Sequence, residues 1–453
     1  MNQWFQKLFR LTSNTTSHIP SNYEKLSRGQ LIQKIQTLEN RLKRNDVLPP
    51  NKPGRKPFDV NRYVERRIAL KVAYLGWNYS GFASQGDENT TPTVEGQLFK
   101  ALTACKLIQQ ADNCQFTRCG RTDKGVSGLG QVVALNVRGT NSKSDTVKDP
   151  LPYVEILNRL LPDDVRILAW APVGPSFNAR FDCKSRTYKY FFEKGQLDLE
   201  LMRTAASYMT GSHDFRNFCR LDPSKNITCY ERTVLSLEIK PLSDDFYEVE
   251  LKGTAFLWHQ VRCIMAILFL VGQKLEKPEI VKNLLDIDLV PARPNYPMAS
   301  DLPLMLYDCE FENMNWIYAN ENNTAKITTP LKTYRHFHEL WNTHIIKGHL
   351  YRTVLQQIES KAINDGTDVR GRINASDNKQ STVLLGAGRT LKSAKYKPLL
   401  SRPKADSDQR YFIAEKTRLR SYKKAEYDPG ILYMNYITSS RKYFWDVIDL
   451  KSS

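Results

Sequence analysis

The hydrophobic pattern between residues 63 and 320 alternates between two periods. Apolar side chains at every second position predict strands around 68–74, 133–137, 165–169, 188–192, 235–239 and 247–251. Apolar side chains at helical spacing predict helices around 91–105, 154–161, 202–209 and 257–271. Two sets of strands and helices of similar size follow each other along the chain. The pattern therefore predicts an α+β fold built on largely antiparallel sheets.

The pattern changes on both sides of this region. Residues 31–42 place aliphatic side chains at helical spacing, which predicts a short amphipathic helix, and the Pro- and Lys-rich stretch 49–57 is typical of a linker. Beyond residue 320 we expect a helix over Thr333–Lys347 and a polar loop over 361–383. The predicted divisions are an N-terminal extension (1–62), an N-terminal module (63–172), a C-terminal module (173–320) and a C-terminal extension (321–453).

The basic charge of the chain is concentrated at its ends. Of 453 residues 41% are hydrophobic, enough for a folded core, and the net charge is +18. Residues 1–62 hold 12 Lys/Arg against 4 Asp/Glu, and residues 381–453 hold 15 against 7. Basic ends predict a polyanionic partner, most simply nucleic acid, with plain solubilising tails as the alternative. We expect no membrane span, because every apolar run is shorter than the roughly 18 residues that one needs.

Targeting and metal-binding signals are weak. Residues 1–23 lack acidic side chains, which suits a weak mitochondrial presequence as well as a disordered tail. The eight cysteines form no C-x-x-C pair, and their scatter indicates reduced thiols rather than a disulfide framework or a zinc site. We expect surface positions for the histidines of the C-terminal extension, because no cysteine or carboxylate completes a metal site with His336, His338, His344 and His349.

The segment RCGRTDKGVS at 118–127 is the most informative part of the chain. It places Asp123 among Arg118, Arg121 and Lys124, with two glycines that permit a tight loop. Nearby positive charge favours an ionised carboxylate, which can act as a nucleophile, and the same cations can hold RNA phosphates. Two other interpretations of this loop stay open: a structural turn and a phosphate-binding loop. It lacks, however, the Lys-Ser/Thr pair of a P-loop.

Two further features carry candidate chemistry. Arg262 lies on a helix that is apolar almost all round, so its guanidinium requires a specific acceptor that periodicity cannot name. Aromatic and basic residues alternate over 177–181 and 186–190, which the pattern places on a strand. Such residues can stack a base and hold its phosphate, or simply form a half-buried edge strand. Tyrosines alternate with basic residues over 396–443. This pattern is as consistent with a surface that contacts RNA as with an ordinary small subdomain.

Seven blocks of the chain resemble one known family. The block RCGRTDKGVSG at 118–128 is similar to the catalytic motif of the TruA family of tRNA pseudouridine synthases. The other blocks follow in the family's order: YLGWNYSGFASQ at 74–85, TVEGQL at 93–98, LPDDVRI at 161–167, FNARFDCKSRTYKY at 177–190, GSHDFRNF at 211–218 and FLWHQVR at 256–262. The resemblance implies an enzyme that isomerises uridine to pseudouridine in tRNA without a metal or other cofactor.

The resemblance also implies roles for individual residues. Asp123 becomes the catalytic aspartate, acting at C6 of the uracil, at C1′ of the ribose, or otherwise promoting glycosidic cleavage. Tyr188 is expected to stack on the flipped uracil and to help remove the C5 proton, and Arg262 to pair with Asp123. Arg121 is expected to help extrude the uridine, since the glycosidic bond is inaccessible in a stacked helix. Further substrate-binding residues are expected to be Arg118, Lys124, Arg180 and Tyr190.

The implied architecture is two related modules in one antiparallel sheet with a central basic cleft, assembled as a homodimer. Leu75 stands where the family usually has Asp, and Phe82 where it has Trp. Three features resemble the eukaryotic branch that modifies uridines 38 and 39: these departures, the segment LPLMLYDCEF at 302–311 and the basic ends. For this protein the resemblance implies a nuclear and cytoplasmic location. The branch acting at positions 27 and 28, a non-catalytic tRNA-binding protein on the same scaffold and a phosphate-handling enzyme stay open as alternatives.

Overall fold

The computed structural model describes residues 63–86, 88–142, 151–220, 227–243, 245–318, 328–364 and 381–404. All of them belong to one compact unit within Val60–Ser453. The helix predicted over 31–42, the linker over 49–57 and the presequence therefore lie outside the described residues.

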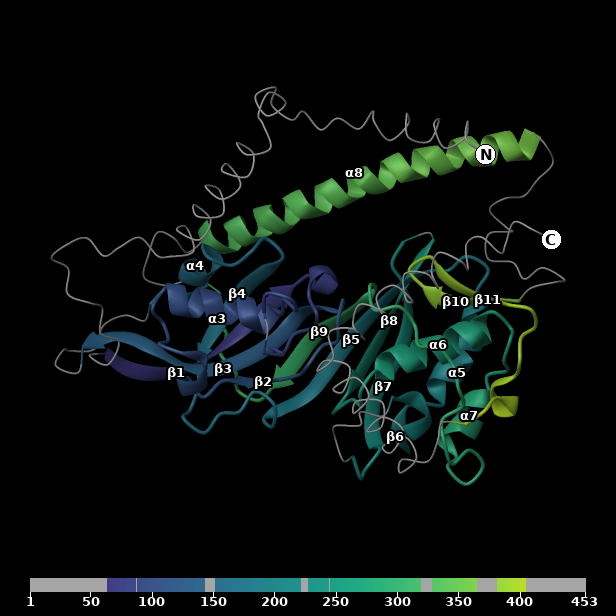
Figure 1. The fold of residues 1–453 in the computed structure, drawn as a ribbon, viewed down its shortest axis with the longest axis horizontal. Helices are drawn as coiled ribbons and strands as arrows, with labels where there is room; N and C mark the ends of the chain where they lie inside the picture. The colour runs from purple at the N-terminus through teal and green to yellow at the C-terminus, as the bar shows by residue number, and fades with distance from the viewer. Residues whose placement is uncertain are drawn as a thin grey trace, which may run out of the picture. The chain divides into compact units, whose positions relative to one another are not determined.

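One large mixed sheet organises the described residues (Figure 1). Its strands follow the order β4 (Val165–Pro172), β1 (Tyr63–Tyr74), β3 (Ser127–Ser142), β9 (Leu304–Phe311), β5 (Cys183–Glu193), β8 (Phe246–Gly253), β7 (Glu231–Pro241) and β6 (Gly211–Asp214), with β2 (Thr117–Arg118) beside β3. Neighbours are antiparallel except β3 and β9, whose parallel pairing is short and joins Ser127 to Met305 and Gly128 to Leu306. The predicted α+β fold on largely antiparallel strands is confirmed.

Helices cover the sheet in both modules. The α-helices are α3 (Val94–Ala104), α4 (Tyr153–Asn158), α5 (Leu199–Ser207), α6 (Gln260–Gly272), α7 (Ile280–Leu285) and α8 (Thr328–Asn364). Short 3-10 turns are η2 (Gly76–Asn78), η3 (Ala111–Asn113), η4 (Arg216–Phe218) and η6 (Leu399–Ser401). A separate hairpin joins β10 (Ser381–Gly386) to β11 (Arg389–Ser393). The six strands and four helices predicted from periodicity are all present, whereas the pattern does not predict β9.

Alternation along β1 sorts its side chains to the two faces of the sheet. Leu70 is fully buried in a core cluster with Leu98 of α3 and Leu157 of α4. Ala69, its neighbour, lies in a smaller cluster that we place on the opposite face. The C-terminal module has its own core around α6, whose residues are buried almost throughout. Each large aliphatic side chain buried in these cores contributes about 1.5–3 kcal/mol.

The predicted strand over 177–181 is wrong. β5 begins only at Cys183, and the preceding segment forms turns. The side-chain oxygen of Asn178 accepts hydrogen bonds from the backbone N–H of Arg180 at 3.0 Å and of Phe181 at 3.4 Å. A short polar side chain that bonds its own backbone in this way favours a turn over a strand.

The helix predicted over Thr333–Lys347 is confirmed as part of α8, which extends it at both ends. Two residues of α8, His336 and His344, contact the N-terminal module. Nε2 of His336 lies 2.6 Å from the backbone oxygen of Asp163, and the ring of His344 packs edge-on against Trp77 at 5.5 Å between centroids. His344 is exposed, as expected for a surface histidine.

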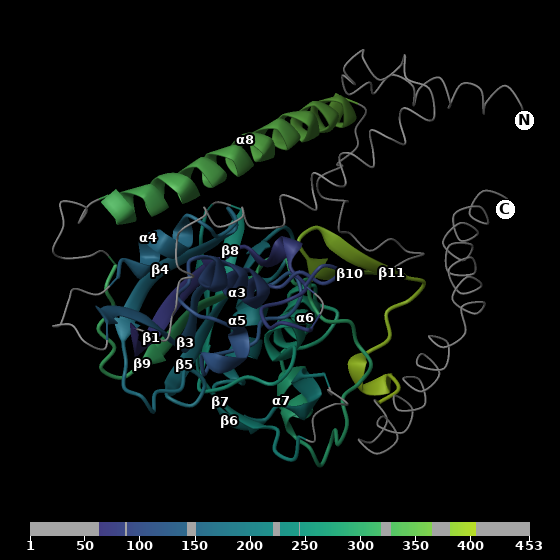
Figure 2. The ribbon, with the colours of Figure 1, turned by 60° about the vertical axis from the view of Figure 1, so that its left-hand side comes forward.

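The β10–β11 hairpin lies beside α6 in both views of the ribbon (Figure 1, Figure 2). The amide of Gln273, at the end of α6, donates to the backbone oxygen of Thr382 at 3.0 Å and accepts from the N–H of Leu384 at 2.8 Å. Val383 and Leu399 are buried in the core around α6. The C-terminal module therefore draws part of its core from beyond residue 320, and residues 381–383 of the expected loop are strand.

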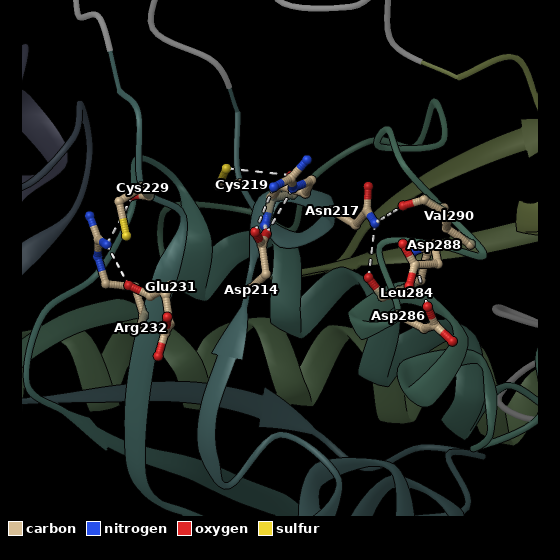
Figure 3. Close-up of polar contacts among 11 residues, drawn as sticks. Asp214, Asn217, Cys219, Cys229, Glu231, Arg232, Leu284, Asp286, Asp288 and Val290 are labelled. Carbon is tan, nitrogen blue, oxygen red and sulfur yellow. Dashed lines mark hydrogen bonds and ion pairs between the residues drawn. The ribbon is translucent and has the colours of Figure 1, made fainter.

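The buried side-chain amide of Asn217 connects several segments of the C-terminal module by hydrogen bonds (Figure 3). The side chain of Asn217 in η4 donates to the backbone oxygens of Leu284 at 2.9 Å and Val290 at 2.7 Å. Its backbone oxygen accepts from the hydroxyl of Tyr296 at 2.6 Å. Hydrogen-bonded amides of this kind fix neighbouring segments because an unpaired buried amide is costly. The GSHDFRNF block therefore has a structural role around α7.

Candidate active site

Asp123 lies on the loop 119–126 that connects β2 to β3, and the loop is fixed at both ends. At its start the side-chain amide of Gln131 accepts from the N–H of Gly120 at 3.2 Å and donates to its oxygen at 2.9 Å. At its centre the hydroxyl of Thr122 lies 2.8 Å from that of Tyr74. These buried hydrogen bonds hold the loop, so Asp123 projects from a fixed backbone.

Residues 74–85, the first block that resembles the family, contact the other side of this loop through backbone hydrogen bonds. The N–H of Phe82 donates to the oxygen of Thr122 at 3.1 Å, and the N–H of Gly125 donates to the oxygen of Tyr79 at 3.2 Å. A Cβ on Gly76 would lie 2.0 Å from the backbone oxygen of Val126, so only glycine permits this approach. The blocks at 74–85 and 118–128 are therefore one structural unit.

Two side chains at the start of α6 contact the carboxylate of Asp123. The indole N–H of Trp258 donates to Oδ1 at 3.2 Å, and Nε2 of His259 lies 3.4 Å from Oδ2. The two rings stack, with centroids 4.2 Å apart. His259 has φ of 60°, a strained value for a residue with a side chain, and such strain clusters at functional sites. Sequence reasoning missed both residues, although FLWHQVR contains them.

Arg262 finds a different partner from the expected one. It was expected to pair with Asp123, but the carboxylate in ion-pair contact with it among the described residues is that of Asp301, at 3.3 Å. Its Nε also donates to the backbone oxygen of Ala299 at 2.8 Å. Nη1 of Arg389, the first residue of β11, lies 3.8 Å from the same oxygen of Asp301. The requirement for a specific acceptor is thus met by a segment that leads into β9.

Asp301 also touches the catalytic loop directly. A Cβ on Gly125 would lie 2.0 Å from Oδ2 of Asp301, and the φ of Gly125 is +80°, in the left-handed region. Asp301 therefore connects the guanidinium of Arg262 to the loop that carries Asp123. No sequence signal identified it, because it belongs to none of the seven matching blocks.

The two tyrosines of β5 differ in their surroundings. Tyr188 is half-buried and packs edge-on against Phe256 at 5.1 Å between ring centroids. Burial raises the pKa of Tyr188 well above its usual range, and the nearby thiols and Asp123 raise it further. Tyr190 is fully buried in the core and packs against Phe269. Tyr190 is thus a core residue, and its full burial does not leave it facing a substrate.

The expected cationic residues divide into exposed and paired ones. Arg121, Lys124 and Arg180 are exposed. Arg118 instead forms an ion pair with Glu95 of α3, Nη2 to Oε1 at 3.0 Å. Burial nevertheless raises the pKa of Glu95 above its ordinary value, against the lowering effect of Arg118. Arg118 therefore anchors the start of the loop to the N-terminal module.

All eight cysteines are free thiols, as expected, but three that are far apart in the sequence lie together in the fold. Cys119, Cys183 and Cys309 are buried together, with their sulfur atoms within 4.8 Å of one another. Periodicity and spacing could not show this, because Cys119 comes from the loop after β2, Cys183 from β5 and Cys309 from β9. In the part of the chain that the structure describes, no helix has both the length and the apolar character to cross a membrane.

Fold and site together define an RNA-modifying class of enzyme, in which an aspartate on a glycine-containing loop lies beside an aromatic strand and an arginine-bearing helix. A family model described as tRNA pseudouridine synthase matches residues 205–312. The tRNA pseudouridine(38/39) synthase of Homo sapiens is 40% identical over 409 residues, covering 83% of this chain and 82% of the relative. The enzyme of the same name from Saccharomyces cerevisiae is 47% identical over 333 residues, covering 67% and 75%.

A more distant relative extends the match beyond eukaryotes. The tRNA pseudouridine synthase A of Methanothermobacter thermautotrophicus is 33% identical over 275 residues, which cover 60% of this chain and 92% of the relative. The chain belongs to the TruA family of tRNA pseudouridine synthases, which are isomerases. The resemblance in the sequence is thereby confirmed.

Proposed function

We propose that this protein isomerises uridine to pseudouridine at positions 38 and 39 in the anticodon stem-loop of tRNA. The observation that carries the proposal is the similarity to relatives named for these two positions, which spans 83% of the chain for the human enzyme. The site agrees with it, because Asp123 lies on a fixed loop with polar and aromatic neighbours from the second module.

The chemistry requires one bond to break and one to form. The N1–C1′ bond breaks, a C5–C1′ bond forms, and the proton on C5 is lost while N1 gains one. Neither oxidation nor net hydrolysis takes place. Asp123 assists the cleavage as a carboxylate, at C1′, at C6 or by promoting glycosidic cleavage. The indole of Trp258 donates a hydrogen bond to this carboxylate and the ring of His259 lies beside it, so both side chains orient Asp123.

Arg262 and Asp301 act as positioning residues in this proposal. The ion pair between them holds the first turn of α6 against the segment that precedes β9, and Asp301 abuts Gly125 of the catalytic loop. Ordered second contacts of this kind keep a catalytic group in its productive geometry.

Tyr188 acts in this proposal through its ring and its protonated hydroxyl. Its pKa lies well above the usual range because of burial, so the phenol keeps its proton near neutral pH. A protonated phenol is a poor base for the C5 proton but a good stacking surface and hydrogen-bond donor. The rate of isomerisation is therefore expected to vary with pH in the same way in the wild-type protein and in Tyr188→Phe. A rate that rises with pH as the Tyr188 hydroxyl ionises, with the rise absent in Tyr188→Phe, would instead assign it the role of base.

We propose that exposed cations around the loop and the basic ends bind the tRNA backbone in a basic cleft. Support comes from the exposure of Arg121, Lys124 and Arg180 and from the positive net charge of residues 1–62. Deleting residues 1–59 is expected to weaken tRNA binding and to flatten its dependence on salt. An unchanged salt slope would remove this segment from the interface.

Assembly and location follow from the family and the basic ends. We propose a homodimer, which light scattering on the purified chain tests directly; a monomeric mass would contradict it. We propose a nuclear and cytoplasmic location on the ground of the basic extensions, which imaging of a fluorescent fusion tests. Confinement to mitochondria would contradict the location and favour the presequence interpretation of residues 1–23.

The substrate position is tested by mapping pseudouridine with carbodiimide on unmodified tRNA transcripts. Matched transcripts carry cytidine in place of uridine at 38, at 39, or at both, with uridines 27 and 28 kept. Product at 38 and 39, lost position by position in the matched transcripts, is the expected result. Product at 27 or 28 alone would keep the family and contradict the position. Tight binding with no product anywhere would mean a non-catalytic tRNA-binding protein.

A further inference from the structure

Three buried thiols converge on the face of the sheet behind the catalytic loop. Cys119 precedes Gly120 in that loop, Cys183 is the first residue of β5, and Cys309 lies in β9. Their sulfur atoms all lie within 4.8 Å of one another, and all three side chains are buried. A metal ion bound about 2.3 Å from each sulfur holds thiolates about 3.8 Å apart, which this separation accommodates.

The surroundings of the cluster combine an apolar wall with one cation. Ala69, Ala134 and Leu306 belong to the same buried cluster. The guanidinium of Arg186 donates to the backbone oxygens of Cys119 at 3.2 Å and of Cys183 at 3.5 Å. Positive charge is therefore placed beside the three buried thiols.

We propose that Cys119, Cys183 and Cys309 bind one thiophilic metal ion, and that this ion is Zn²⁺. Soft thiolate ligands select Zn²⁺ and Cu⁺ among the common metals. Three thiolates bring three negative charges, which the two charges of Zn²⁺ and the one of Arg186 balance. Cu⁺ would leave one negative charge buried without compensation, which is costly. The three thiol protons leave to solvent on binding.

A metal ion bound at this site would connect the two modules where the sheet joins them by a short strand pairing. Within the sheet the modules meet where β3 pairs with β9 over only two residue pairs. Cys119 comes from the N-terminal module, whereas Cys183 and Cys309 come from the C-terminal module, with Cys309 on the strand β9 that pairs with β3. A bound ion would fix the start of the Asp123 loop relative to β5, which carries Tyr188. The inference concerns a site distinct from the proposed catalytic chemistry and does not depend on its substrate.

The test measures metal in the full-length protein purified without chelators. Elemental analysis is expected to find one zinc per chain, and titration of chelator-treated protein with Cd²⁺ is expected to give a thiolate-to-metal charge-transfer band that saturates at one equivalent. Each of Cys119→Ala, Cys183→Ala and Cys309→Ala is expected to lose both signals. Cys219→Ala and Cys263→Ala, which alter buried cysteines outside the cluster, are expected to retain them.

Each outcome decides the proposal. Absence of stoichiometric metal together with no Cd²⁺ band in the wild-type protein would overturn it, and this measurement needs no variant to fold. One copper per chain would keep the site and contradict the choice of ion. Retention of both signals in the three cluster variants, or their loss in the two control variants, would place the metal elsewhere. If the ion fastens the modules, chelation lowers the Tm of the wild-type protein but not of Cys309→Ala.

Discussion

At the scale of the residue, the site is organised around two carboxylates rather than one. Asp123 accepts contacts from Trp258 and His259, whereas Asp301 pairs with Arg262. The apolar helix around Arg262 predicts that its guanidinium needs a partner. It does not predict which one, because Asp301 lies 39 residues further along the chain and is brought close only by the tertiary fold.

Asp301→Asn is expected to lower the rate of isomerisation about 10- to 100-fold while tRNA affinity stays within about 3-fold. The substitution removes the charge that holds Arg262 and that borders the catalytic loop. Single-turnover kinetics and filter binding measure the two quantities. The matched control is Asp308→Asn in β9, whose ion pair with Lys71 is more exposed and should contribute little. Equal losses in both variants would refute a positioning role for Asp301.

Gly125→Ala is expected to destabilise the protein by about 1–2 kcal/mol and to lower activity as well. The new Cβ would occupy a left-handed backbone position and would displace the carboxylate of Asp301. Gly120→Ala lies in the same loop, but a Cβ there meets nothing within 4 Å, so it serves as the control. Urea unfolding and single-turnover assays compare the two. A Gly125→Ala protein as stable and active as Gly120→Ala would contradict the close approach of Asp301.

At the scale of the element, hydrophobic periodicity identified the strands and helices whose two faces differ. It did not identify β9, because a β-bulge opposite Thr187 and Tyr188 skips Tyr307 and breaks the alternation. It placed a strand over 177–181, where the side chain of Asn178 stabilises a turn instead. Local bonding and irregular register are therefore the features that the pattern could not predict.

Leu399→Ala is expected to destabilise the protein by about 2–5 kcal/mol, because it leaves a cavity in the core around α6. Its neighbour in η6, Leu400, is 45% exposed, whereas Leu399 is 0% exposed. Leu400→Ala is therefore expected to change stability by no more than about 0.5 kcal/mol. Thermal or urea unfolding measures both. Similar effects of the two substitutions would mean that the segment around η6 is not part of this core.

At the scale of the whole molecule, composition and charge predicted an RNA partner, and the order of motifs predicted the family and the sheet. They could not predict how the modules meet, since that depends on a short parallel pairing between distant strands. The convergence of Cys119, Cys183 and Cys309 is a consequence of the same meeting. Features that depend on contacts between modules therefore required the structure.

Stability is expected to fall as the pH rises above about 10. Burial raises the folded-state pKa of Tyr74, Tyr190 and Tyr296, whereas unfolded tyrosines ionise near pH 10. Above that pH the unfolded chain releases protons that the folded chain keeps, so each buried tyrosine costs about 1.4 kcal/mol per pH unit. Urea unfolding between about pH 8 and about pH 11 measures the slope.

Matched variants separate this effect from other alkaline changes. Tyr296→Phe removes one buried hydroxyl and should make the slope shallower, whereas Tyr334→Phe alters an exposed ring and should leave it unchanged. Equal slopes for the wild-type protein and both variants would show that the buried tyrosines do not control alkaline stability.

The central claim is that Asp123 carries out uridine isomerisation, and release of tritium from C5 of tritiated uridine in tRNA tests it most directly. We expect single-turnover release by the wild-type protein without added cofactor. For Asp123→Asn we expect a rate at least about 10⁴-fold lower, with tRNA affinity within about 3-fold. An Asp123→Asn protein that releases tritium within about 10-fold of the wild-type rate would contradict the account.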